Sequence, residues 1–470
     1  MKSEIERIVA DVKSGHTSAR AEVERALAQA RERDELHCLL EVCVEQALAR
    51  ADRLDARIKK GEPVGRLAGV PYVAKDNFLT KVGHTTAASK MLDNFRSPID
   101  ATAIERIEAE DAIMIGKANL DAFAHGGSTE NSAFGPTHNA IDKGRVAGGS
   151  SGGSAVAVAS GIVPFALGSD TGGSIRQPAS FNGVVGYKPT YGMISRYGVV
   201  AMASSTDTVG PITRTVRDSE IIADILAGQD QRDSTVYPGY FSPLTESPSG
   251  KRIGLIEDFI GEGVDDDVAS QTNQLAQRLR ESGHQVDLVK LPMAQYALAI
   301  YYIVIPAELS SNMARYDGIR YGERSPEAHR LDDVYGMSRD DGLMPENKRR
   351  IMIGSYVLSS GYYDAYYLKA QQARTLLIRQ LDKLFESYDF LLSPVSPTPA
   401  FKLGENTHDP LKMYLADAMT VPASLAGLPA ISVPNGRSGT GLPIGIQLIA
   451  PAKADASLLA MAKQLEADNA

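Results

Sequence analysis

The chain of 470 residues contains no tryptophan and only two cysteines, Cys38 and Cys43. The motifs CxxC and HExxH are both missing, which argues against a disulfide framework and against a structural zinc site. No apolar run is long enough to span a membrane, and residues 1–10 carry charges in place of the apolar segment of a secretory signal. These absences predict a cytoplasmic protein that binds no metal.

Positive charge is also in short supply. The sequence has 49 Lys and Arg against 58 Asp and Glu, a formal net charge of −9. A protein that grips a polyanion neutralises phosphates with basic side chains, so this chain alone is not expected to bind nucleic acid. Its length would allow two or three domains. No repeat or low-complexity tract divides it, and we expect one compact unit.

The apolar pattern predicts an α/β protein that begins with helices. Residues 1–60 should form a helical segment packed on the core, with Ser3 and Glu6 as a capping box and Gly15 as the helix stop. Residues 61–470 alternate short apolar strands with helices, which predicts a central, mostly buried mixed sheet covered by helices on both faces. The predicted strands are 39–43, 68–74, 112–115, 252–256, 285–291, 390–393, 430–434 and 443–449, and the predicted helices include 44–59, 102–110, 266–282 and 362–385.

Two clusters of glycine and serine stand out, GGSSGGS at 148–154 and DTGGS at 170–174. Glycine lets successive N–H groups converge on a concavity that binds a phosphate or the oxyanion of acyl transfer. Neither cluster has the Walker lysine or a G-x-G-x-x-G after a clear strand, which argues against phosphate. GGSSG at 148–152 matches the nucleophile elbow G-x-S-x-G, but that elbow follows a buried apolar strand, and residues 139–149 are polar and glycine-rich.

Longer motifs around these clusters point to a family. They are GGSSGGS at 148–154, GSDTGGSIRQPA at 168–179 and GVVGYKPTYG at 183–192, with VPYVAKDN at 70–77 upstream. Together they closely resemble the amidase signature family, whose members hydrolyse amides with a Ser, Ser, Lys triad. The resemblance implies that residues 61–470 are a catalytic domain of the amidase-signature fold, with Ser174 as nucleophile, Ser150 as bridging serine and Lys75 as base.

The chemistry explains these residue types. A serine hydroxyl needs a neighbouring base, and a lysine can be that base only when burial or nearby donors lower its pKa. Lys75 follows an apolar stretch and is expected at the end of a buried strand. By resemblance, a cis peptide holds Ser150. Asp170 and Arg176 flank the nucleophile, and we interpret them as a structural ion pair. The expected oxyanion hole consists of the backbone N–H groups of Thr171, Gly172, Gly173 and Ser174.

Further segments resemble one branch of the family, the glutamine-splitting component of the glutamyl-tRNA(Gln) amidotransferases. They lie at 127–139, 195–216, 312–322, 348–371 and 413–434. This resemblance implies a glutaminase in a heterotrimer with the B and C subunits, where the released ammonia converts misacylated tRNA. It also implies that tRNA, ATP and Mg²⁺ are used by the partners, so that this chain itself binds no cofactor.

The same resemblance implies how glutamine is held. Arg350 would take its carboxylate and Asp417 its ammonium, with Tyr301 lining the pocket. Two positions depart from the family pattern, since His125 replaces a usual methionine and Ala122 a usual glutamate. His125, a candidate substrate-binding residue, either titrates near neutral pH or is tolerated because the backbone makes the contact there.

Two alternatives have the same motifs. A stand-alone amidase acting on small or aryl amides would use the same triad without a partner. A non-enzymatic scaffold protein of the same complex would need a lost triad member, and all three are present.

Overall fold

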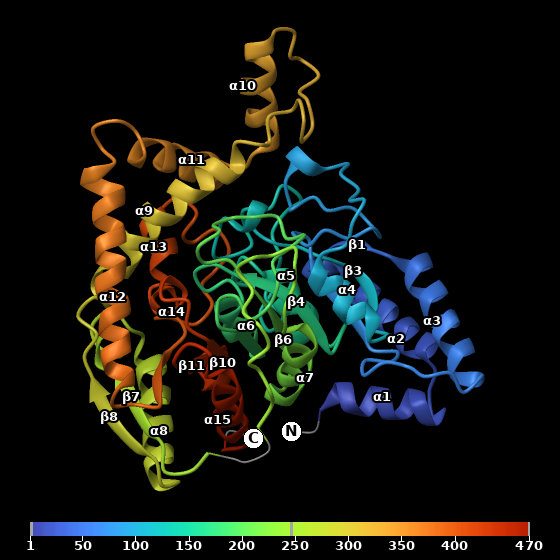
Figure 1. Cartoon of the computed structure of the whole chain (residues 1–470), viewed down its shortest axis with the longest axis horizontal. Helices are drawn as coiled ribbons and strands as arrows, with labels where there is room; N and C mark the ends of the chain where they lie inside the picture. Colours follow the sequence, from blue (N-terminus) through green and yellow to red (C-terminus); the bar gives the residue numbers. More distant parts are fainter. Residues whose placement is uncertain (1–2, 245–247, 469–470) are drawn as a thin grey trace.

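The computed structural model describes residues 3–244 and 248–468. Within them eleven strands form one sheet (Figure 1). The strands are β1 (Leu39–Val42), β2 (Pro71–Lys75), β3 (Ile113–Ala118), β4 (Phe165–Asp170), β5 (Val185–Lys188), β6 (Thr208–Thr213), β7 (Arg252–Ile256), β8 (Gln285–Val289), β9 (Phe390–Pro394), β10 (Ala430–Arg437) and β11 (Pro443–Ile449).

The sheet is mixed, with the order β1-β3-β2-β4-β6-β5-β10-β11-β9-β7-β8. β2 pairs in parallel with β3 and β4, β7 pairs in parallel with β8 and β9, and the other neighbours are antiparallel. Because β2 and β4 are parallel neighbours, their carboxyl ends meet at one edge of the sheet. Lys75 ends the first of these strands and Asp170 the second.

Helices cover the sheet. In the described residues they are α1 (Glu4–Ser14), α2 (Ala19–Glu32), α3 (Val44–Lys59), α4 (Thr102–Ala109), α5 (Gly152–Ala159), α6 (Arg176–Asn182), α7 (Val216–Leu226), α8 (Asp266–Glu281), α9 (Ala294–Met313), α10 (Leu331–Gly342), α11 (Pro345–Val357), α12 (Lys369–Phe385), α13 (Pro410–Leu415), α14 (Val421–Leu425) and α15 (Asp455–Asp468). None of them combines the length and the apolar character that a membrane crossing requires.

The strand pairing shows that helices lie on both faces. Gly168 and Gly210 pair across β4 and β6 and face Ile175, which immediately precedes α6. Thr213 of β6 points to the opposite face, where its hydroxyl bonds Ser219 of α7 at 2.6 Å. The α/β fold with a buried, mixed sheet between two helical layers is therefore confirmed.

The first helix begins and ends where the sequence indicates. Ser3 Oγ accepts a hydrogen bond from the N–H of Glu6 at 3.0 Å, and Gly15 ends the helix with a φ of +79°. The other half of the predicted capping box is replaced, because the Glu6 carboxylate accepts from Arg217 of α7. α2 and α3 pack on β3, so the segment lies against the edge of the sheet.

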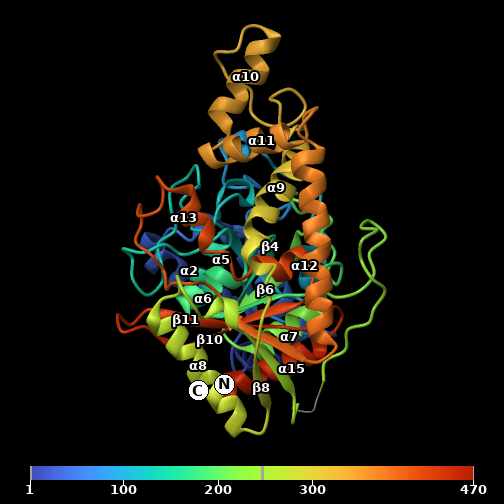
Figure 2. The same ribbon diagram turned by 90° about the vertical axis from the view of Figure 1, so that its left-hand side faces the viewer.

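The part between β8 and β9 differs most from the prediction. Residues 294–357, which the sequence left unassigned, form α9, α10 and α11. The predicted helix over 362–385 starts with a π-helical turn, Asp364–Leu368, before α12. Both views show α10 projecting from the body, beyond α11 (Figures 1 and 2).

Candidate active site

Lys75 meets Ser150 at the carboxyl end of β2. Its Nζ donates to Ser150 Oγ at 2.7 Å and to Ser169 Oγ at 3.0 Å, and Lys75 and Ser150 are both fully buried. Burial lowers the pKa of Lys75 to about 7, although the carboxylates of Asp121, Asp170 and Asp207 pull it upward. A large fraction of this amine is therefore neutral near pH 7, as a general base requires.

The loop before α5 presents Ser150 to the lysine. The peptide bond between Gly149 and Ser150 is cis, in agreement with what the resemblance implied. Gln177 of α6 holds this loop, since its Oε1 accepts from Gly149 N at 2.9 Å and its Nε2 donates to Gly127 O at 2.8 Å. The side chain of Gln177 thus holds together the loop that carries Ser150 and the loop that carries Gly127.

Ser174 lies in the turn between β4 and α6, and it is 8% exposed. Its carbonyl accepts from Ser151 N at 3.1 Å, which joins the turn to the loop of Ser150. Within residues 3–244 and 248–468, no hydrogen bond joins the Ser150 and Ser174 hydroxyls. None uses the N–H of Gly172 or of Ser174 either. Donors without a partner are what the oxyanion hole expected at this turn would require.

Neighbouring segments fix the rest of this turn. Thr171 Oγ1 donates to Asp207 at 2.7 Å, and Thr420 Oγ1 donates to Gly172 O at 2.6 Å. A side chain at Gly173, whose φ is +149°, would collide with Thr420. This turn, residues 171–174, is therefore shaped from both sides by groups far apart in the sequence, and it is called the oxyanion turn below after the role expected from the sequence.

Asp170 and Arg176 form a buried, two-pronged ion pair. Arg176 Nε and one terminal nitrogen lie 2.9 and 3.0 Å from the two oxygens of Asp170, and both residues are fully buried. Arg176 also donates to Thr420 O, Gln447 Oε1 and Ser424 Oγ. Because every contact orients a protein group, the geometry fits the structural role inferred from the sequence.

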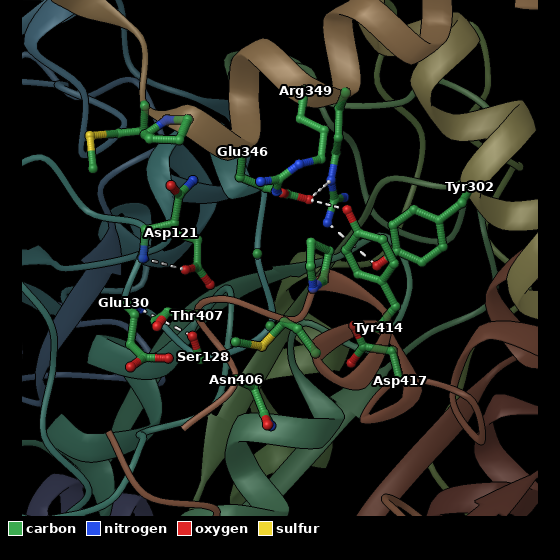
Figure 3. Close-up of a pocket in the computed structure, with 18 residues that line it drawn as sticks. Asp121, Ser128, Glu130, Tyr302, Glu346, Arg349, Asn406, Thr407, Tyr414 and Asp417 are labelled. Atoms are coloured by element: carbon green, nitrogen blue, oxygen red, sulfur yellow. Dashed lines mark hydrogen bonds and ion pairs between the residues drawn. The ribbon is translucent and has the colours of Figure 1, made fainter. Parts of the chain in front are cut away.

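A cavity of about 260 Å³ lies next to this turn. Figure 3 shows Asp121, Ser128 and Glu130 on one side, with Tyr302, Tyr414 and Asp417 on the other. The lining residues are Asp121, Gly126, Gly127, Ser128, Glu130, Asn131, Tyr302, Met344, Pro345, Glu346, Arg349, Arg350, Asn406, Thr407, Pro410, Met413, Tyr414 and Asp417. The volume is below the range of about 300–1,000 Å³ for drug-sized ligands and suits a smaller molecule.

Arg350 is the buried cation of this cavity. Its Nε donates to Glu346 Oε1 at 2.8 Å, and its guanidinium lies 5.1 Å from the ring centre of Tyr302 and 5.7 Å from that of Tyr414. Tyr414 also donates to Glu346 Oε1, at 2.9 Å. α11 can approach α9 closely because Gly354 has no side chain to strike the carbonyl of Pro306. The packing thus holds one arginine in a single orientation.

Asp417 supplies the anion. A side chain at Gly127 or Gly173 would lie 3.3 or 3.4 Å from its carboxylate, which places Asp417 between the two loops of the site. Burial raises the pKa of Asp417 to about 8, with Arg350 opposing the shift. Its Oδ1 is buried and has no hydrogen-bond partner in the described part of the chain. A cationic ligand would satisfy this oxygen and stabilise its ionised form.

The other two candidate pocket residues lie outside the cavity lining. Tyr301 packs against the oxyanion turn, since a Cβ at Gly172 would sit 2.7 Å from its hydroxyl. His125 is fully buried beside Asn347, with its Nδ1 2.6 Å from the Asn347 amide nitrogen. Burial lowers the pKa of His125 well below its usual value, and nearby Arg350 lowers it further. This histidine is therefore neutral at physiological pH.

Several site residues could not be read from the motifs. Asp121 lines the cavity, and its carboxylate accepts from the N–H groups of Thr129 and Asn131 at 2.9 and 3.0 Å. Burial raises its pKa to about 6. The contact of Glu346 with Arg350 could have been predicted from the sequence, because the two residues are four apart and so share one helix face.

Across residues 3–244 and 248–468, no group of three or more His, Cys, Asp or Glu residues is placed to hold a metal ion.

Comparison with known proteins places this geometry in a family. A family model described as Amidase matches residues 21–459. The A subunit of the glutamyl-tRNA(Gln) amidotransferase of Koribacter versatilis (strain Ellin345) is 49% identical over 436 residues, 92% of this chain and 91% of that protein. The crystal structure of the corresponding protein from Thermotoga maritima has a TM-score of 0.81 at 40% identity and covers 96% of this chain and 92% of its own.

A crystal structure outside that branch is similar as well. A bacterial aryl acylamidase of the amidase signature enzymes has a TM-score of 0.83 at 29% identity, covering 98% of this chain and 95% of that one. The resemblance recognised in the glycine and serine motifs is confirmed by these matches. The chain belongs to the amidase family.

Proposed function

We propose that this chain is the glutaminase component of a tRNA-dependent amidotransferase. The observation that carries the proposal is the cavity whose lining holds both the buried Arg350 and the half-buried Asp417, whose carboxylate lies beside Gly173. One cation and one anion match the carboxylate and the ammonium of a free amino acid. The similarity to the Koribacter versatilis protein over nine-tenths of the chain supports this choice among the activities of the family.

In the proposed reaction, Ser174 Oγ attacks the carbonyl carbon of the glutamine side-chain amide. Its proton passes through the Ser150 hydroxyl to Lys75, whose Nζ is 2.7 Å from Ser150 Oγ. Backbone N–H groups of 171–174 stabilise the oxyanion, each aligned donor contributing about 3 kcal/mol. When the C–N bond breaks, Lys75 returns the proton through Ser150, and ammonia leaves.

The second half of the reaction regenerates the serine. Water attacks the acyl ester on Ser174, gives its proton to Lys75 by the same relay, and releases glutamate as the ester C–O bond breaks. That proton returns to the Ser174 oxygen. The balance of the two halves is one glutamine and one water consumed, with one glutamate and one ammonia formed.

The ammonia has a defined use in this proposal. The B and C subunits complete a heterotrimer that converts Glu-tRNA(Gln) to Gln-tRNA(Gln) with ATP and Mg²⁺. The net charge of −9 fits a division of labour in which tRNA and nucleotide are bound by the partners. This chain then needs no cofactor for its own step.

The alternative is a stand-alone amidase for small or aryl amides, and the similarity to an aryl acylamidase favours it. An aryl amide presents no cation to Asp417, whose Oδ1 would then stay buried without a hydrogen-bond partner from the described part of the chain. Polar groups buried without partners are costly. The lining therefore favours an amino acid over an aryl amide.

The test is ammonia release from glutamine by the chain alone, and then with the B and C subunits, ATP, Mg²⁺ and misacylated tRNA. Activity that rises sharply in the complete mixture, together with its loss in Ser174→Ala, is the expected result. Strong turnover of simple amides by the chain alone, with no effect of the partners, would assign it to the stand-alone amidases.

A further inference from the structure

Two walls of the cavity come from distant parts of the chain. The loop after β3 provides one wall through Asp121, residues 126–128 and residues 130–131, and the first turns of α11 provide the other through Glu346 and Arg350. The cavity keeps its shape only if the loop and the helix are held at a fixed separation.

The loop has an unfavourable backbone and needs outside support. Phe123, Ala124 and Thr129 have φ values of +54°, +65° and +59°. These values lie in the left-handed region, which residues other than glycine rarely adopt. Such conformations persist only where surrounding contacts determine them. The Asp121 carboxylate provides internal support by accepting from the N–H groups of Thr129 and Asn131.

Asn347 reaches the loop from α11. Its Oδ1 accepts from Met344 N at 3.0 Å, and this bond fixes the orientation of the side-chain amide. Its amide nitrogen therefore faces the loop and donates to Ala122 O at 2.8 Å, with His125 Nδ1 at 2.6 Å. Both hydrogens of the amide are used.

The geometry also assigns the tautomer of His125. Nδ1 accepts from Asn347, so the ring proton of the neutral imidazole is on Nε2. The backbone carbonyl of His125 accepts from the side chain of Asn131 at 2.9 Å, within the same loop. One residue thus contacts the lining loop through its carbonyl and the lining helix through its ring. His125 and Asn347 are both fully buried.

We propose that the hydrogen bond between His125 and Asn347 forms a clasp. The clasp positions the loop after β3 against α11 and so sets the affinity for glutamine. His125 and Asn347 are positioning residues, since neither lines the cavity. This inference rests on the proposed glutaminase function. It accounts for the polar residue at a place where the sequence pattern of the family has methionine.

The test measures kcat and KM for glutamine in the assembled complex, together with the unfolding temperature. His125→Leu removes the acceptor at a similar volume, and Asn347→Leu removes the donor. Each is expected to raise KM about tenfold, the factor of one buried hydrogen bond, with kcat within about twofold. The double variant should raise KM little more than Asn347→Leu alone, because the two substitutions break the same hydrogen bond.

Two further variants separate positioning from stability. His125→Asn places an amide oxygen near the position of Nδ1, so KM should return to within about twofold of the unmodified chain. Asn435→Leu is the matched control, since Asn435 is a buried asparagine that donates to Gln271 O at 3.0 Å, on an element that does not line the cavity. It should lower the unfolding temperature and leave KM unchanged.

The outcomes discriminate clearly. Unchanged KM in His125→Leu and Asn347→Leu, or a lower unfolding temperature with only kcat reduced, overturns the clasp. If the unmodified complex releases no ammonia from glutamine, the proposed function fails and the clasp fails with it. A raised KM that His125→Asn restores establishes the clasp.

Discussion

Protonation of Lys75 should control the rate of glutamine hydrolysis. An ordinary lysine has a pKa of 10.5, whereas burial lowers that of Lys75 to about 7. At pH 7 the neutral fraction is therefore about one half, against about 0.03% for an unperturbed lysine, a gain of roughly a thousandfold in active base. At pH 6 it falls to about one tenth. We expect kcat to drop about fivefold from pH 7 to 6 and a further tenfold from 6 to 5.

The assay is ammonia release by the complex at saturating glutamine, from pH 5 to 9. At saturating glutamine the pH profile of kcat reports the protonation of Lys75. Asp417, whose pKa is raised to about 8, affects the binding of glutamine instead. Lys75→Met removes the base without adding charge, and Lys75→Arg supplies a permanent cation. Both should lose about a thousandfold or more in kcat while remaining folded. A flat profile between pH 5 and 8, or near-normal activity in folded Lys75→Met, would refute the assignment.

Three further predictions concern neighbouring groups. Gly172→Ala places a Cβ 2.7 Å from the Tyr301 hydroxyl and should lower kcat/KM at least about tenfold by displacing the oxyanion turn; an unchanged rate would contradict the packing. Glutamine binding to Ser174→Ala at pH 7 should release nearly one proton, because Asp417 is mostly protonated when empty and ionises beside an ammonium; calorimetry in buffers of different ionisation enthalpy measures it, and no buffer dependence would exclude Asp417 as the ammonium site. Arg176→Ala leaves Asp170 buried and unpaired and should destabilise the fold by about 3–5 kcal/mol in chemical unfolding; a loss under about 1 kcal/mol would show that the pair is dispensable.

The sequence was sufficient for the parts of the fold that depend on local pattern. The strands near 71–75, 390–394 and 443–449 are largely apolar, and the structure buries each of them completely. The region of α9 to α11 could not be assigned, because its helices pack through residues that form no single apolar stripe. The π-helical turn before α12 has no sequence signal that we can identify.

The site shows the same division. Lys75 and Ser150 were identified from motifs, and the structure brings them into contact. The bonds of Asp121, Tyr414 and Asn347 join segments that are distant in the sequence or depend on loop geometry, so no local pattern could predict them. His125 was identified as a departure from the family pattern. Its partner became visible only once α11 was placed beside the loop.

The order in which this protein is synthesised gives the Arg176 contacts a further meaning. The nucleophile turn is made early in translation, but Arg176 takes acceptors from Thr420, Ser424 and Gln447, close to the carboxyl end. A nascent chain still lacking these residues leaves the turn unsupported and the anion of the cavity unplaced. The turn at Ser174 can therefore reach its final geometry only after the last strands of the sheet have been made and placed.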